Sequence, residues 1–344
     1  MDLIVKQKGH INRWIANQSE YEMNKIPIIL HAGMEKTGTK AIQNWLAINK
    51  EGLKNEGWWI PNSLGQKNHR IATMLGYDLN RRDDATQRRG IRTEQQLRAF
   101  QEDVQKKLSE EIKQCRQSNC KAILISSELA SSRLTRVREI DRLFSQLRMA
   151  GCGPILVLIF RRDPIKLIES RHTTAIECEG WTERHPPRPG HPQADLFGDQ
   201  IGLVRRWNKA CGLHQNIDLD ILWYAKDTLK AGSSVKTIAE LLDCQDGLKS
   251  TAEDIQANES ATLPWLMYKR WRNIVDKEKM NNVMNTKIQE KTKGLLVKIL
   301  PKWKYKLPLK RVSEYRDAYQ KSFRGKNEKW LSSSTWCSNT NPEN

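Results

Sequence analysis

The stretch IILHAGMEKTGTKAIQNWL, residues 28–46, decides how the chain is interpreted. An apolar run over 26–31 predicts a short buried strand, a turn containing Gly33 and Gly38 follows it, and residues 39–50 have the apolar spacing of a helix. Such a junction binds anions, because the first amide groups of a helix lack internal partners and the helix dipole attracts negative charge. The sequence therefore predicts a phosphate-binding loop between this strand and this helix.

The loop differs from the nucleotide-binding P-loop, G-x-x-x-x-G-K-[ST], in the position of its lysine. The two glycines have the expected spacing, but a threonine precedes Lys40 and a second lysine, Lys36, lies inside the loop. In nucleoside triphosphate enzymes a Ser or Thr directly after the lysine holds Mg²⁺, and here Ala41 takes that place. The loop therefore suits an anion whose charge the protein neutralises better than it suits ATP with Mg²⁺.

The remaining sequence alternates between apolar runs and helical patterns up to about residue 245. Near-continuous apolar strands separated by helices are typical of a parallel sheet that is covered on both faces. We therefore predict an α/β fold of the P-loop NTPase-like kind, with loop and some helix over 62–93 and an irregular loop over 180–198. Strands are expected over 57–61, 121–128, 154–164 and 217–225, and helices over 93–118, 138–151, 165–174, 201–212 and 233–244.

Composition gives the class of protein and of partner. The 344 residues are 38% hydrophobic and 28% charged, which predicts a folded core, and the formal net charge of +18 indicates an anionic partner. No apolar run approaches the roughly 18 to 20 residues of a membrane span, and the first 25 residues lack the core of a signal peptide. The seven cysteines include no C-x-x-C pair, so we expect reduced thiols in a cytoplasmic protein and no cysteine metal site.

Three parts are expected along the chain. Residues 1–24 read as an N-terminal extension, 25–250 as the core, and 251–344 as a basic, mainly helical part that completes the same domain and borders the acceptor site. Within the last part, the lysine-rich segment 293–311 is either a solvated face with extended lysine side chains or an anion-binding rim.

Two motifs, each at a strand-to-helix junction, resemble those of the sulfotransferases that use 3'-phosphoadenosine 5'-phosphosulfate (PAPS). KTGTK at 36–40 is similar to the family's 5'-phosphosulfate loop, K-[ST]-G-T-[TS], except that Lys40 replaces the final hydroxyl residue. FRRDPIKLIES places an arginine, a proline and a serine at the spacing of the family's 3'-phosphate element. The segment ILWYAKDTLK is similar to the family's strand and YE-x-L turn, although Ala225 replaces the usual acid. The resemblance covers roughly residues 26–245 and implies the sulfotransferase variant of the P-loop fold.

The resemblance implies how the loop treats PAPS. Lys36 would meet the negative charge that develops on the bridging oxygen as the nucleotide leaves. The amides and hydroxyls of Thr37, Gly38 and Thr39 would hold the 5'-phosphate, and Lys40 would either join them or point to solvent.

The rest of the nucleotide would be held further along the chain. The resemblance implies that Arg162, by a forked charge-assisted bond, and Ser170 hold the 3'-phosphate. In FRGKNEKW, Arg324 would belong to a basic loop that closes the nucleotide site, or else to a basic tail. No metal is required.

An acceptor hydroxyl also needs a general base. Glu128 ends a predicted strand, in a chain position where related enzymes place catalytic or substrate-binding groups, and His69 follows the second short strand, where other branches place their base. The alternatives are a helix-cap or ion-pair role for Glu128 and a surface position for His69. His172 is a third candidate.

The predicted activity is therefore transfer of a sulfuryl group from PAPS to a hydroxyl or amine of an acceptor. The basic composition favours an acidic glycan or a glycolipid headgroup, and we expect no nucleic-acid partner. The alternatives are a small-molecule kinase on a related P-loop fold, a basic nucleic-acid-binding protein, and a non-catalytic relative that binds a partner. The sequence indicates neither the acceptor nor the oligomeric state.

Overall fold

The structure is a computed structural model, and it describes residues 8–18, 25–244, 261–278, 303–323 and 330–332. The chain forms two compact units. The first contains Met1–Arg162, Ile201–Ala252 and Gly325–Asn344, and the second contains Asp163–Gln200 and Glu253–Arg324. The compact units are defined by contacts in space, whereas the predicted parts were divided along the sequence after residues 24 and 250. The predicted division therefore stays a prediction.

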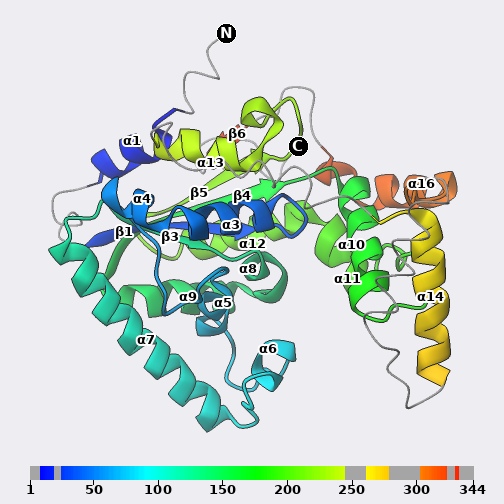
Figure 1. Cartoon of the computed structure of the whole chain (residues 1–344), viewed down its shortest axis with the longest axis horizontal. Helices are drawn as coiled ribbons and strands as arrows, with labels where there is room; N and C mark the ends of the chain where they lie inside the picture. The colour runs from blue at the N-terminus through cyan, green and yellow to red at the C-terminus, as the bar shows by residue number, and fades with distance from the viewer. Residues whose placement is uncertain (1–7, 19–24, 245–260, 279–302, 324–329, 333–344) are drawn as a thin grey trace. The chain divides into compact units, whose positions relative to one another are not determined.

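A six-stranded sheet forms the centre of the first unit (Figure 1). Five neighbouring strands are parallel, and the last pairs antiparallel with β5. The fold is therefore α/β, as predicted, and the glycine loop between β1 and the next helix fits a P-loop-like fold. In sheet order the strands are β2 (Trp58–Trp59), β3 (Ala122–Ser126), β1 (Ile26–Gly33), β4 (Cys152–Arg161), β5 (Ile217–Trp223) and β6 (Trp330–Ser332).

Helices cover both faces of this sheet (Figure 1). On one face, alternate strand residues such as Ile29 and Leu156 pack with Ile42 of α3 and Ile238 of α13 in one apolar cluster. Because successive strand side chains point to opposite faces, the other half of each buried strand faces the second layer of helices. The helices are α1 (His10–Ala16), α3 (Thr39–Ile48), α4 (Lys50–Asn55), α5 (Arg70–Leu75), α6 (Asp84–Gln87), α7 (Glu94–Gln117), α8 (Leu129–Arg133), α9 (Val137–Met149), α12 (Gln200–Cys211) and α13 (Ser234–Leu242), with a 3₁₀ turn at Lys230–Gly232.

The segment predicted as an N-terminal extension contributes to the core of the first unit. Ile11 of α1 is fully buried in the apolar cluster of the sheet. Trp14 donates its indole N–H to Asp218 of β5 over 2.8 Å, and His10 Nε2 lies 2.7 Å from Asp220 Oδ2. Helix α1 is therefore attached to β5 by both apolar and polar contacts.

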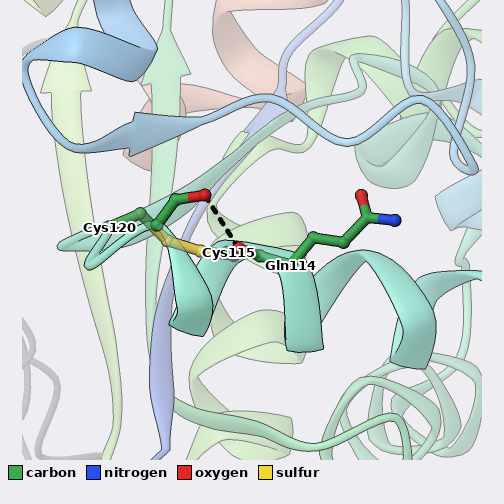
Figure 2. The surroundings of a disulfide bond; sticks show 4 residues. Gln114, Cys115 and Cys120 are labelled. Atoms are coloured by element: carbon green, nitrogen blue, oxygen red, sulfur yellow. Dashed lines mark hydrogen bonds between the residues drawn. A yellow bond between two sulfur atoms is a disulfide. The ribbon is translucent and has the colours of Figure 1, made fainter.

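A disulfide joins Cys115, in the last turn of α7, to Cys120, which precedes β3 (Figure 2). Asn119, with φ of 51°, turns the chain back, so that the two Cα atoms lie 5.4 Å apart. The prediction of reduced thiols is therefore wrong for this pair. It rested on the absence of C-x-x-C, whereas two cysteines five residues apart also meet across a helix end. Cys152, Cys178, Cys211 and Cys244 are free, Cys337 lies outside the described residues, and the cytoplasmic location stays a prediction.

The second unit is helical in its described part. Trp265 and Leu266 pack against Ile176 in a small apolar core, and Asn273 donates to the Ile176 carbonyl over 2.8 Å. The predicted irregular loop over 180–198 ends in a helix, because His191 caps it and a proline occupies its first turn. The helices are α10 (Pro164–Cys178), α11 (Pro192–Gly198), α14 (Leu263–Glu278) and α16 (Leu309–Ala318), followed by a 3₁₀ turn at Gln320–Ser322.

None of the helices within the described ranges is both long enough and apolar enough to cross a membrane. Most of the lysine-rich segment 293–311 lies outside the described residues, as does the predicted closing loop.

Candidate functional site

The loop between β1 and α3 has a backbone that only its glycines permit. Gly33 has φ of 110° and Gly38, the N-cap of α3, has φ of 77°. A Cβ on Gly33 would lie 2.7 Å from Ser131 Oγ, and one on Gly38 would lie 3.1 Å from the ring of Tyr224 and closer still to Ser234. Both glycines are therefore required by conformation and by space.

The threonines of the loop hold the loop itself together. Thr37 and Thr39 both donate their hydroxyl hydrogens to the Met34 carbonyl, over 2.6 Å and 3.0 Å. Both side chains are buried, whereas Lys40 is exposed and Lys36 is half-buried. The amides of Ala41 and Ile42 donate to the Gly38 carbonyl, so the amides that precede them at the start of α3 are the donors best suited to an anion. Phosphate contacts by the threonine hydroxyls stay a prediction.

Arg162 follows β4 and reaches the loop. Its Nη1 donates to the Lys36 carbonyl over 2.7 Å, and its guanidinium lies 5.6 Å from the centre of the Tyr224 ring. Lys36 has φ of 64°, an uncommon conformation for a residue other than glycine, and this bond fixes the direction of its carbonyl. Arg161 is instead fully buried over the Trp223 ring. The two adjacent arginines therefore differ, and the half-buried Arg162 is the one positioned at the loop.

Two further residues predicted for the nucleotide belong to other parts of the chain. Ser170 is in α10, in the second unit, where its carbonyl accepts hydrogen bonds from the hydroxyls of Thr173 and Thr174. Its pairing with Arg162 stays a prediction. Arg324 lies outside the described residues, so its role also stays a prediction.

Glu128 lies beside the loop at the end of β3. A Cβ on Gly33 would come within 3.2 Å of the Glu128 Cα atom, so the backbones are in close contact. Gln43 of α3 donates from Nε2 to Glu128 Oε2 over 2.5 Å and to the Ser126 carbonyl over 3.3 Å. The half-buried carboxylate is therefore held in place next to the loop and keeps access to solvent.

His69 is the second predicted base, and it is buried. Its Nδ1 accepts the Ser126 amide over 2.8 Å, and its own amide donates back to the Ser126 carbonyl over 3.0 Å. An amide always donates, so the neutral ring carries its proton on Nε2 and offers no lone pair there. Burial, and next the charge of Lys50, lower the pKa of His69 to about 4. The geometry thus favours Glu128 as the base.

The third candidate, His172, lies in the second unit. Its ring centre is 4.9 Å from that of Tyr305, and its Nε2 lies 3.1 Å from the Arg184 carbonyl oxygen. Burial lowers its pKa to about 4. These contacts account for a buried structural histidine.

Gln43, Tyr224 and Ser234 were missed by sequence reasoning. Gln43 carries a detectable signal, since it is a polar residue on the helix face that also carries Ile42 and Leu46, all three being buried. Tyr224 and Ser234 support Gly38 from β5 and α13, and their roles depend on strand order, which the sequence does not display.

Within the described ranges, no three His, Cys, Asp or Glu side chains gather as a metal site would require.

No family model and no curated protein matches the chain. Among solved structures, a chain from the PezAT chromosomal toxin–antitoxin system of Streptococcus pneumoniae is similar at 12% identity, over 78% of this chain and 92% of that one, with a TM-score of 0.30. At this TM-score the likeness carries no weight for function, and the proposal below rests on the residues of the site.

Proposed function

We propose that the chain transfers a sulfuryl group from PAPS to an acceptor hydroxyl or amine, without a metal ion. One observation supports this most: the ends of three adjacent parallel strands bring together Lys36 with its anion-binding loop, Glu128 and Arg162. Ligands of open α/β sheets bind outside the carboxyl ends of the strands. A cationic loop, a half-buried carboxylate and an arginine at one such edge are suited to group transfer between an anionic donor and a hydroxyl.

The proposed step divides the work among these residues. The acceptor oxygen forms a bond to sulfur while the bond from sulfur to the bridging oxygen breaks, and 3'-phosphoadenosine 5'-phosphate leaves. Lys36 and the amides at the start of α3 stabilise the charge that develops on the leaving phosphate. Glu128 takes the proton of the acceptor hydroxyl, and Gln43 keeps the carboxylate aimed at the loop.

The kinase alternative is less favoured by the residues present. A P-loop kinase places a metal-binding hydroxyl after the loop lysine, whereas here the apolar Ala41 follows Lys40. The threonine hydroxyls of the loop are directed at the Met34 carbonyl. Mg²⁺-dependent ATP turnover would overturn the proposal.

Arg162 can contact the 3'-phosphate directly, or it can support binding only by holding the Lys36 carbonyl. Comparing two ligands on two proteins separates these roles. Calorimetry would compare 3'-phosphoadenosine 5'-phosphate with 5'-AMP, in the unchanged protein and in Arg162→Ala. A direct contact predicts that the variant loses the preference for the 3'-phosphate, a loss of about 10-fold to 100-fold, because hydrogen bonds to charged groups contribute about 1.5–3 kcal/mol. Equal weakening of both ligands would mean that Arg162 acts only by holding the Lys36 carbonyl.

The role of Glu128 is tested by a single-turnover transfer assay on Glu128→Gln. We expect a drop in transfer rate of about 10²-fold or more, the usual contribution of a general base, with nucleotide affinity unchanged. Glu102→Gln, on the exposed side of α7, is the matched control. Full activity in Glu128→Gln would exclude this carboxylate as the base.

A further inference from the structure

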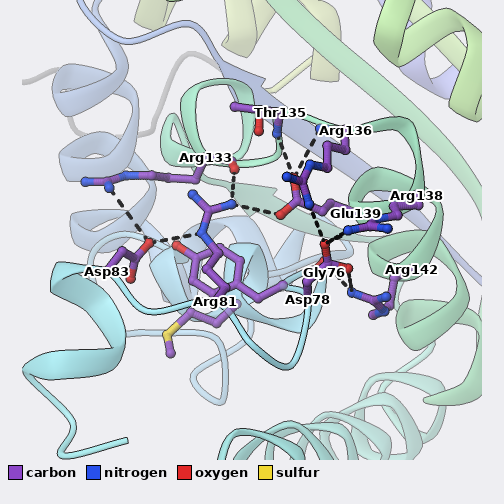
Figure 3. Close-up of polar contacts among 12 residues, drawn as sticks. Gly76, Asp78, Arg81, Asp83, Arg133, Thr135, Arg136, Arg138, Glu139 and Arg142 are labelled. Carbon is purple, nitrogen blue, oxygen red and sulfur yellow. Dashed lines mark hydrogen bonds and ion pairs between the residues drawn. The ribbon is translucent and has the colours of Figure 1, made fainter. Parts of the chain in front are cut away.

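A network of arginines and acids lies between the segment after α5 and the start of α9 (Figure 3). In one half of it, two arginines pair with three carboxylates. Arg81 donates to Glu139 over 2.8 Å and lies 3.4 Å from Asp83, while Arg133 pairs with Asp84 over 2.8 Å. Arg81 also lies 4.4 Å from the centre of the Tyr77 ring. These contacts join the segment after α5 and α6 to α8 and α9, and have a structural role.

The other half of the network carries an excess of positive charge. A single carboxylate, Asp78, receives Arg138 at 2.6 Å, Arg142 at 2.9 Å and Arg136 at 3.2 Å (Figure 3). Three positive charges on one negative charge leave an excess of two. The Asp78 side chain is 11% exposed, whereas the side chains of Arg136 and Arg138 are 62% and 61% exposed. The excess positive charge therefore faces solvent. We call Asp78, Arg136, Arg138 and Arg142 the arginine cluster.

The arrangement is one that a second anion would complete. Burial alone would raise the pKa of Asp78, but hydrogen bonds from Arg142 and Arg138 lower it below its usual value, so the carboxylate is charged. Guanidinium groups held this close repel one another, and each has five N–H donors in a planar fork that suits carboxylate or sulfate oxygens. An anionic group from solution would relieve the repulsion and use these donors.

The arginine cluster is close to the candidate site along two paths through the chain. From Glu128, helix α8 leads to Arg133 and then to Arg136; one short helix and three further residues span at most about 18 Å. From His69, hydrogen-bonded to Ser126 at the end of β3, helix α5 leads to Asp78. Both paths start at the carboxyl end of β3, so the cluster is within reach of an extended acceptor that also contacts Glu128.

We propose that Arg136, Arg138 and Arg142 bind a carboxylate or sulfate group of the acceptor, and that this acceptor is an acidic carbohydrate. This inference rests on the proposed transferase function. It gives the cluster the role of placing one sugar residue while a neighbouring hydroxyl reaches Glu128.

The test uses the full chain and a size-defined heparin-derived tetrasaccharide, with its desulfated, N-acetylated and carboxyl-reduced form as the uncharged control. Calorimetry would measure both saccharides and 3'-phosphoadenosine 5'-phosphate on the unchanged protein, on Arg136→Gln/Arg138→Gln and on Arg98→Gln. We expect the acidic saccharide to bind the unchanged protein and to bind the double variant about 100-fold more weakly, since each lost charge-assisted contact is expected to weaken binding by about 10-fold. Arg98→Gln, on the exposed side of α7, would match the unchanged protein, and nucleotide binding would be the same in all three.

Each failure has its own meaning. Acidic saccharide binding that is absent, or equal in the double variant, would overturn the inference while leaving nucleotide binding intact. If the unchanged protein did not bind 3'-phosphoadenosine 5'-phosphate, the proposed function would be overturned instead. An oligonucleotide that bound the same arginines more tightly than the saccharide would replace the carbohydrate by a nucleic acid and so contradict the inference. Because Arg136 and Arg138 are exposed, the double variant is expected to fold, and an unchanged circular dichroism melt would verify this.

Discussion

The loop after β1 and the arginine cluster are both suited to anions, but they are built in opposite ways. The loop offers backbone groups to an anion. Its threonine side chains are buried, a Cβ on either glycine would collide with neighbouring atoms, and the start of α3 supplies amides. The cluster uses side chains, with two exposed arginines around one nearly buried carboxylate. A backbone site selects one ligand by shape, whereas a cluster of exposed charges selects a class of ligand by charge. The predictions below test this difference, from the largest expected effect to the smallest.

The backbone site should lose the most affinity when its space is filled. Gly38→Ala is expected to weaken binding of 3'-phosphoadenosine 5'-phosphate by at least 10-fold and to destabilise the protein by about 1–3 kcal/mol, because the new methyl group meets Ser234 and Tyr224. Gly90→Ala is the matched control, since Gly90 also has a positive φ, 68°, but has nothing near its Cβ position. That control should lose only about 1 kcal/mol of stability and keep its affinity. Equal affinities of the two variants in calorimetry would contradict the steric account of the loop.

Gln43 should affect transfer rather than binding. Gln43→Leu removes the donor to Glu128, so we expect kcat to fall by about 10-fold to 100-fold while nucleotide affinity is kept, because misplacement of a reacting group lowers the rate steeply. Gln101→Leu is the control, as this buried glutamine donates to three backbone carbonyls away from the loop. It should lower the melting temperature without lowering kcat. Unchanged kcat in Gln43→Leu would remove Gln43 from the site.

Asp78 should give effects of opposite sign on stability and on binding. Asp78→Asn leaves three arginines without their carboxylate, so we expect a loss of about 1–2 kcal/mol of stability, discounted for their exposure, together with tighter binding of the acidic tetrasaccharide. The pKa of Asp78 is lowered in the folded state, so its contribution to stability is present above the unfolded pKa of about 4 and is lost as the pH falls through the folded value. The melting temperatures of the two proteins should therefore converge in acid. A gap that did not narrow as the pH fell, or weaker saccharide binding, would count against the cluster.

Added salt should have the smallest of these effects, and it should weaken binding at the two sites to different degrees. Exposed charges are screened over a distance of about 8 Å at physiological ionic strength, and partly buried ones much less. We expect the affinity for the acidic tetrasaccharide to fall more steeply with added NaCl than the affinity for 3'-phosphoadenosine 5'-phosphate. Parallel slopes in the two titrations would mean that both ligands meet the same kind of surface.

The same contrast explains what the sequence could predict. The loop was predictable because its strand, glycines and helix are contiguous, and the β4 junction with Arg162 could be found for the same reason. The parallel orientation of β1 to β5, although not their order in the sheet, followed from buried apolar runs alternating with helices. The antiparallel β6 could not be predicted, since three residues carry too little pattern.

The contacts that could not be predicted from the sequence join residues that meet only after folding. Gln43 reaches Glu128 across 85 positions of the chain, and Arg138 reaches Asp78 across 60. The choice between Glu128 and His69 likewise required the hydrogen bond from the Ser126 amide, which fixes the imidazole tautomer. The disulfide shows the converse, because Cys115 and Cys120 are near in sequence yet match none of the familiar spacings.

The most direct test of the central claim is the nucleotide preference of the unchanged protein. Calorimetry without metal would compare 3'-phosphoadenosine 5'-phosphate, 5'-AMP and ATP. The account predicts that the nucleotide with the 3'-phosphate binds at least 10-fold more tightly than 5'-AMP, and that ATP gains nothing from Mg²⁺. Equal affinity for the first two, or Mg²⁺-dependent binding of ATP, would contradict it.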